Sequence, residues 1–137
     1  MKRMMTVSML TLMGASIASA QTIENDLLKV ERKGQVISLA SMPPGTLFAP
    51  KLTFPKKIAK SAVTTRTHDV WGSGKVLELT HENGWTTTLA VYPTSPFVHV
   101  HTTVVNPAGK AVVFNQFDFL KIETDLGVDL DSLRVLG

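Results

Sequence analysis

The chain has 137 residues, no cysteine and a formal net charge of +3, which is enough for one small domain and excludes thiol catalysis and cysteine-based zinc sites. Lys2 and Arg3 account for two of the 14 basic side chains, so the rest of the chain has 12 basic against 11 acidic ones. This balance lacks the electrostatic footprint of nucleic-acid binding, and we predict no nucleic-acid partner.

The first twenty residues have the features of an export signal. Lys2-Arg3 is a short basic region, Met4 to Leu12 is apolar, and Ala18-Ser19-Ala20 is a small-x-small cleavage pattern. The apolar run is too short to span a bilayer. We predict a signal peptide over 1–20, a mature domain over 21–137, a periplasmic or secreted bacterial protein, and no membrane association after cleavage.

Strand-like segments begin soon after this leader. Asp26–Arg32 and Gln35–Ser41 flank Lys33-Gly34, a pattern that predicts a hairpin or bulged meander. Residues 42–60 contain scattered prolines, which predict a segment without a long regular element. Residues 61–70 then resemble a polar edge strand.

The most regular part of the sequence runs from Lys75 to Ile122. After a predicted turn at Gly72–Gly74, segments rich in β-branched and aromatic residues alternate with turn residues. This alternation predicts four consecutive antiparallel strands. Their expected ranges are 75–81, 85–92, 97–105 and 110–122.

Asn83-Gly84 is the sharpest turn motif, because a two-residue type I′ hairpin needs positive φ at both central positions. That turn would place His81 opposite Thr86 and Leu77 opposite Ala90. In this register both faces of the hairpin have apolar side chains. We therefore expect an all-β antiparallel sandwich in which part of the sheet is covered on both faces, by a second sheet and by another element.

The sequence ends on the apolar dipeptide Leu136-Gly137, without a polar tail. An apolar final strand is unusual at the end of a complete domain. We expect the sandwich to be incomplete, and the isolated mature chain to aggregate or pack loosely.

Two histidines two residues apart suggest a weak metal site. His99 and His101 would share one face of a strand. Metal binding needs at least one more ligand, which His81 or Asp118 could provide through tertiary packing. The alternative is that both are polar residues on a partly exposed face.

The acidic residues near the end do not form a recognisable catalytic pair. Asp125, Asp129 and Asp131 lie close together in sequence, whereas glycoside hydrolysis needs two carboxyls opposed across a bond. An acidic run of this kind is more often a solvated face or a weak calcium loop. We predict no catalytic residue and no cofactor.

Three aromatic residues are candidates for carbohydrate contact. The rings of Trp71, Trp85 and Tyr92 could form a platform on which a sugar stacks. We favour the alternative, in which both tryptophans complete the core at the ends of strands, since large aromatic side chains are mostly buried.

Several strand and turn motifs between about residues 75 and 137 can be compared with known families. They are residues 76–80, 91–98, 104–107, 124–127 and 133–137. Together these motifs resemble the N-terminal β-domain of bacterial alpha-galactosidase-like proteins, in the glycoside hydrolase family 36 and raffinose-synthase group. This resemblance implies a galactose-mutarotase-like supersandwich that packs against a downstream catalytic barrel. The barrel provides the catalytic aspartates in that family, so no catalytic residue is assigned to this chain.

Two other functions remain open. The chain could be a free-standing exported β-sandwich that binds carbohydrate or a protein partner. It could also be an assembly module that donates or accepts a strand.

Overall fold

The computed structural model describes residues 20–113, 116, 118–125 and 127. These residues form nine strands and no helix, which confirms the predicted all-β fold. The strands are β1 (Gln21–Glu24), β2 (Leu28–Lys33), β3 (Val36–Ser41), β4 (Leu47–Thr53), β5 (Ile58–His68), β6 (Gly72–His81), β7 (Thr86–Val91), β8 (His99–Thr103) and β9 (Lys121–Glu123). The described part of the chain contains no helix that could cross a membrane. All of the predicted signal peptide except Ala20 lies outside the described residues.

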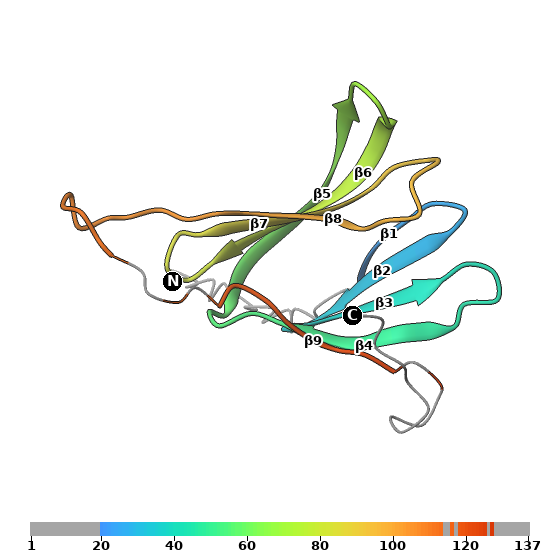
Figure 1. Ribbon diagram of the computed structural model, residues 1–137, viewed down its shortest axis with the longest axis horizontal. Coiled ribbons are helices and arrows are strands. Elements are labelled where there is room, and N and C mark those ends of the chain that lie inside the picture. The colour runs from blue at the N-terminus through green and yellow to red at the C-terminus, as the bar shows by residue number, and fades with distance from the viewer. Residues whose placement is uncertain (1–19, 114–115, 117, 126, 128–137) are drawn as a thin grey trace, which may run out of the picture.

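The strands form two antiparallel sheets that face one another as an open sandwich (Figure 1). The first sheet has the order β1-β2-β3-β4-β9, and the second has the order β5-β6-β7-β8. Each strand from β1 to β4, and from β5 to β8, pairs with its neighbour in sequence. The polar segment predicted as an edge strand is β5, and it does lie at an edge.

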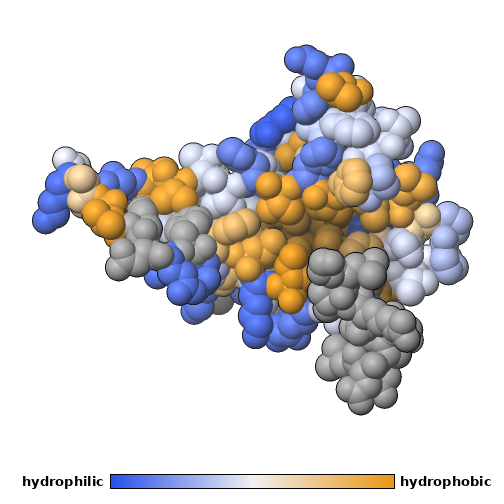
Figure 2. Space-filling model, in the orientation of Figure 1, coloured by the Kyte–Doolittle hydropathy of each residue, from blue (hydrophilic) through white to orange (hydrophobic). Residues whose placement is uncertain are grey.

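The core lies between the two sheets. Figure 2 shows apolar side chains gathered there, while most of the strand ends are polar. Every strand from β1 to β7 contributes to this core, and in β2, β3, β6 and β7 the buried residues alternate along the strand. The buried members are Ile23, Leu28, Val30, Ile37, Leu39, Ala49, Leu52, Ile58, Leu77, Leu79, Leu89 and Val91.

The strand predicted over 110–122 is shorter than expected and pairs with a different strand. The described residues between Lys110 and Leu120 are outside any strand, while β9 pairs with β4 of the first sheet. The chain therefore crosses from one sheet to the other after β8. Phe114 and Phe117 lie outside the described residues.

The segment predicted to be irregular contains β4 and the start of β5. Pro50 lies inside β4, where its side chain is exposed. Ile37 pairs with Leu52 but Leu39 pairs with Ala49, so Pro50 and one further residue of β4 face a single residue of β3. Such a bulge accommodates a residue that lacks a backbone N–H group.

The hairpin between β6 and β7 has a three-residue turn in place of the predicted two-residue turn. The His81 N–H donates to the Trp85 carbonyl over 2.8 Å, and the Gly84 N–H donates to the His81 carbonyl over 2.9 Å. Gly84 has φ of +82°, whereas no described non-glycine residue has positive φ. Asn83 therefore occupies a type I turn, and Gly84 is the left-handed residue that follows it.

This turn shifts the hairpin register by one residue. Leu77 lies opposite Leu89 and Leu79 lies opposite Thr87, so the leucines of both strands point toward the first sheet. The other face is polar over most of its length, with Glu78 opposite Thr88. The prediction that both faces are apolar is therefore wrong, except at one end of the sheet.

Two side-chain amides join the sheets at their corners. Asn25 Nδ2 donates to the carbonyls of Tyr92 and Ser95, over 2.6 and 3.0 Å, while its Oδ1 accepts two N–H groups from its own turn. Gln35 donates to the Ile58 carbonyl over 3.0 Å and accepts the Ile58 N–H over 2.7 Å. Both amides thus satisfy backbone groups of the opposite sheet.

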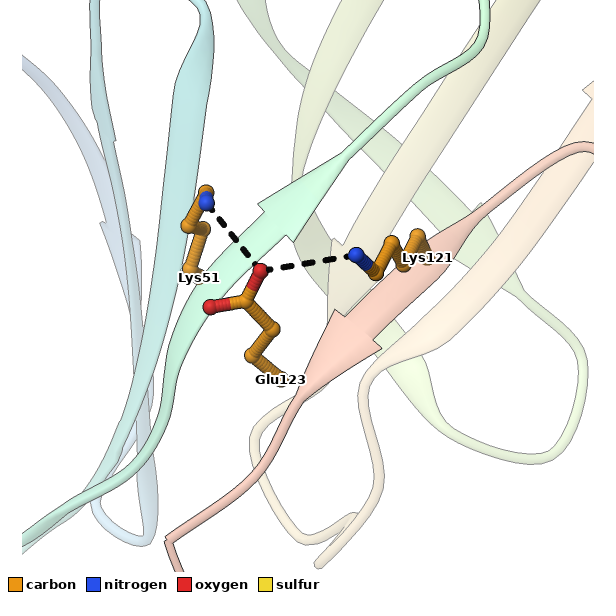
Figure 3. A network of polar contacts seen from close by, with 3 residues as sticks. All are labelled: Lys51, Lys121 and Glu123. Atoms are coloured by element: carbon orange, nitrogen blue, oxygen red, sulfur yellow. Dashed lines mark hydrogen bonds and ion pairs between the residues drawn. The ribbon is translucent and has the colours of Figure 1, made fainter.

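An exposed ion pair joins β4 to β9 (Figure 3). Glu123 Oε1 lies 3.0 Å from Lys51 Nζ and 3.8 Å from Lys121 Nζ. The hydrogen bond from Lys51 is the main cause that lowers the pKa of Glu123, partial desolvation opposes it, and the two lysine charges add to the lowering. Since water screens exposed pairs, their contribution to stability is small.

Candidate carbohydrate-binding face

The outer face of the second sheet has a cluster of four rings at one end, which we call the aromatic corner. It consists of His68 at the end of β5, Trp71 in the following turn, Tyr92 just after β7 and His99 at the start of β8. Tyr92 packs with Val76 and Ala90 in a small buried cluster that is separate from the main core, and Trp71 covers that cluster.

His99 is the centre of the aromatic corner. Its ring centroid lies 5.1 Å from that of Tyr92, in a perpendicular arrangement, and 5.9 Å from that of Trp71. His68 approaches Tyr92 at 5.5 Å, also edge to face. Edge-to-face contacts of this kind are favourable because the positive ring edge meets the negative ring face. The four rings therefore hold one another in place.

A glycine makes room for the aromatic corner. The predicted turn at Gly72–Gly74 is wrong, because the turn lies at residues 69–71 and the glycines begin β6. A Cβ atom on Gly74 would lie 2.4 Å from Tyr92 Cδ1 and 2.6 Å from the Val91 carbonyl oxygen. Only glycine allows the Tyr92 ring to lie flat against β6 at this position.

The loop between β7 and β8 fixes the far side of the corner. The Ser95 hydroxyl is fully buried, accepts the Phe97 N–H over 3.2 Å and lies 3.1 Å from His99 Nε2. Phe97 follows in the same loop, before β8 begins, and its side chain is 63% exposed. An exposed aromatic ring therefore belongs to the loop that contacts His99.

A polar groove of about 350 Å³ continues along the same face, away from the aromatic corner. Arg66 and Glu78 form an ion pair across it at 3.4 Å. The other polar side chains along the groove are Thr80, Thr86, Thr88, His101 and Thr103. Hydroxyl, guanidinium, imidazole and carboxylate groups thus lie next to exposed and half-buried rings.

The structure separates the three predicted sugar-contact residues. Trp71 and Tyr92 meet at the aromatic corner, but Trp85 precedes β7 at its opposite end and belongs to the inner face. Trp85 lines a very small pocket with His81, Phe54 and Phe119. The platform of three aromatic residues is therefore wrong, and Trp85 completes the inner side of the sandwich.

The weak metal candidates share a face, as expected, but have no third ligand in the part of the chain that the structure describes. His99 and His101 both lie on the outer face, where His101 Nε2 is 3.3 Å from the Thr103 hydroxyl. Among the described residues, no group of three or more His, Cys, Asp or Glu side chains could hold a metal ion. Asp118 instead accepts a hydrogen bond from Gln116.

His81 belongs to a buried polar chain on the inner face. Its Nδ1 lies 3.0 Å from the Lys56 carbonyl, and its Nε2 lies 2.9 Å from the Thr87 hydroxyl, which contacts Thr102 at 3.0 Å. A carbonyl only accepts, so Nδ1 carries a proton and donates. In the neutral ring Nε2 then accepts from Thr87. These bonds give His81 a structural role.

The acidic run is described at one residue only. The Asp125 N–H donates to the Phe48 carbonyl and its carboxylate accepts the Gly127 N–H, so it closes a turn beside β4. Asp129 and Asp131 lie outside the described residues.

Sequence reasoning missed His68, Arg66 and Glu78. A usable signal was present, because Arg66 and His68 are two residues apart on a strand and therefore share a face. Comparison with known protein families, characterised proteins and solved structures finds no match to this chain. The resemblance to alpha-galactosidase-like proteins therefore rests on the sequence motifs alone.

Proposed function

We propose that this chain is a non-catalytic β-sandwich domain of an exported alpha-galactosidase-like protein, and that it binds carbohydrate on the outer face of the second sheet. The observation that carries the binding proposal is the aromatic corner beside the polar groove. A sugar has apolar C–H faces and a ring of hydroxyl groups. It therefore needs an aromatic surface for stacking and hydrogen-bonding groups beside it. Small-molecule sites generally combine apolar and polar groups in this way.

The groove supports binding in preference to hydrolysis. Of the described residues that line it, Glu78 alone has a carboxylate, and Arg66 neutralises that group. Glycoside hydrolysis ordinarily uses two opposed carboxyls. In the longer protein that the resemblance implies, the downstream barrel would perform the chemistry and this face would hold part of the sugar chain.

The two tryptophans allow a matched test, because one belongs to the proposed face and the other does not. Raffinose, an alpha-galactoside, would be titrated against the chain by calorimetry. We expect Trp71→Ala to lose at least about fivefold in affinity, on the scale of about 1 to 3 kcal/mol by which a nucleobase stacks on an aromatic side chain. Trp85→Ala should bind like the parent once its fold is verified by circular dichroism.

Fluorescence provides a second readout on the same face. In a Trp85→Phe variant the remaining tryptophan is Trp71, since the chain has two, and sugar should change its emission. Equal loss of affinity in both alanine variants, or no change in Trp71 emission at saturating raffinose, would refute the proposal. The chain alone should release no galactose.

A further inference from the structure

Strand β8 is an edge of the second sheet with unusual chemistry. Among the described residues, it pairs with β7 on one side and with no strand on the other. The stretch from Phe97 to Gly109 contains no Asp, Glu, Lys or Arg, and its one proline, Pro107, lies after the end of β8. Exposed edges of this kind are templates for another strand, and proteins usually block them with charged side chains or proline.

The other three edge strands have charged residues in their strands. β1 ends with Glu24, β5 includes Lys60 and Arg66, and β9 contains Lys121 and Glu123. The neutral edge at β8 is therefore the exception in the described part of the sandwich. It is the edge that another strand could join without meeting a charge.

Apolar side chains lie along the inner side of this edge. Val100 is opposite Leu89, so it belongs to the inner face, and Val104 follows with the same alternation. Each is 37% exposed, because the first sheet does not reach this far. Figure 2 shows apolar surface where the chain leaves β8, on the left of the view. A partner at this edge would cover both valines.

We propose that β8 pairs with β8 of a second copy, antiparallel and centred on Thr102. In that register Val100 of each copy lies opposite Val104 of the other, and Thr102 lies opposite its own equivalent. Cross-strand valine and threonine pairs are favourable, and no charged residues oppose one another. A two-fold axis makes such an interface self-complementary. The second sheets of the two copies, with four strands each, would then join into one continuous eight-stranded sheet.

Sedimentation of the full chain over a range from micromolar to millimolar concentration tests the dimer. We expect a reversible dimer, and Val100→Lys should weaken association at least about tenfold because it places charge against an apolar strand pair. Val63→Lys is the matched control. Val63 also lies on the inner face of an edge strand of this sheet and is 45% exposed, but it is on β5.

Cross-linking tests the register separately. The chain has no cysteine, so Thr102→Cys adds a single thiol that the two-fold axis places opposite itself, at a spacing a disulfide can span. Mild oxidation should produce a covalent dimer. Thr103→Cys, which faces His101 of the second copy in this register, should not cross-link.

Three results would overturn the proposal. They are a monomer at every concentration, equal weakening by the Val63 and Val100 substitutions, and equal cross-linking of the two cysteine variants. Circular dichroism of each variant separates loss of association from loss of fold.

Discussion

The two faces of the second sheet become buried in different ways. On the inner face, Leu77 and Leu89 are covered by a separate sheet that comes from distant parts of the sequence. On the outer face, the described residues that cover Val76 and Ala90 are Tyr92 and Trp71, which belong to the same sheet and its loops. The inner face therefore depends on tertiary packing of two layers, whereas the outer cluster is local. A local cluster can change shape without opening the sandwich, which suits a surface that meets a ligand.

The largest expected effect comes from adjacent residues on the two faces. Leu77→Ala leaves a cavity between the sheets and should lower the free energy of unfolding by about 2 to 5 kcal/mol. Val76→Ala, one residue earlier and equally buried, should cost less, because it removes fewer carbon atoms and because the rings over it can move inward to fill the cavity. Urea denaturation of both variants measures the difference. Equal losses would mean that the outer cluster is as rigid as the core.

An intermediate effect is expected where a methyl group is added beneath the aromatic corner. Gly74→Ala must displace Tyr92 and strain the backbone near Val91, at a cost of about 1 to 3 kcal/mol. The change should also alter Trp71 emission in the Trp85→Phe background. Ser73→Ala, an exposed neighbour, is the control and should change neither quantity. An unchanged melting temperature in Gly74→Ala would show that Tyr92 does not need the glycine.

The smallest effect on stability is expected at Glu123 on β9, at the edge of the first sheet. Because the folded-state pKa of Glu123 is lowered, its stabilisation is present above about pH 4.3, the ordinary glutamate pKa, and is lost as the pH falls through the folded-state value. Glu123→Gln should therefore melt slightly below the parent at pH 7 and at the same temperature near pH 2.

Salt provides the internal check on this ion pair. High salt at pH 7 should remove the difference between the parent and Glu123→Gln, because it screens exposed charges. Glu82→Gln, at an exposed carboxylate without an ion pair among the described residues, is the control. A difference that persisted at low pH would assign the effect to packing.

The strand content could be predicted from the sequence, because turn residues separate segments of alternating polarity. The register of β6 and β7 could not. Asn83-Gly84 suits two turns, one with positive φ at both residues and one with positive φ at glycine only. The choice moves every side chain to the other face. Burial of the leucines against the first sheet decides it, and that sheet is distant in sequence.

Spacing along one strand and pairing between strands place the residues of the candidate site in different ways. Trp85 and Tyr92 are seven residues apart, an odd spacing that puts them on opposite faces of one strand. Tyr92 meets Trp71 only because β5 and β6 form a hairpin that returns the chain to β7.

Pro50 also shows that strand pairing overrides a local pattern. A proline is excluded from a strand only where its missing N–H group would have formed a hydrogen bond. Local patterns identify strands, while pairing decides which residues meet.

The Asn25 side chain, which joins the two sheets, can also be lost through a chemical reaction. Asparagine is among the thermolabile side chains, because its amide can hydrolyse to a carboxylate. At Asn25 that reaction would replace the NH₂ group, which donates to the Tyr92 and Ser95 carbonyls, with an oxygen that repels both. Ageing of this one amide would therefore release the loop that holds His99 and Phe97, and loosen the proposed sugar face before the core between the sheets opens.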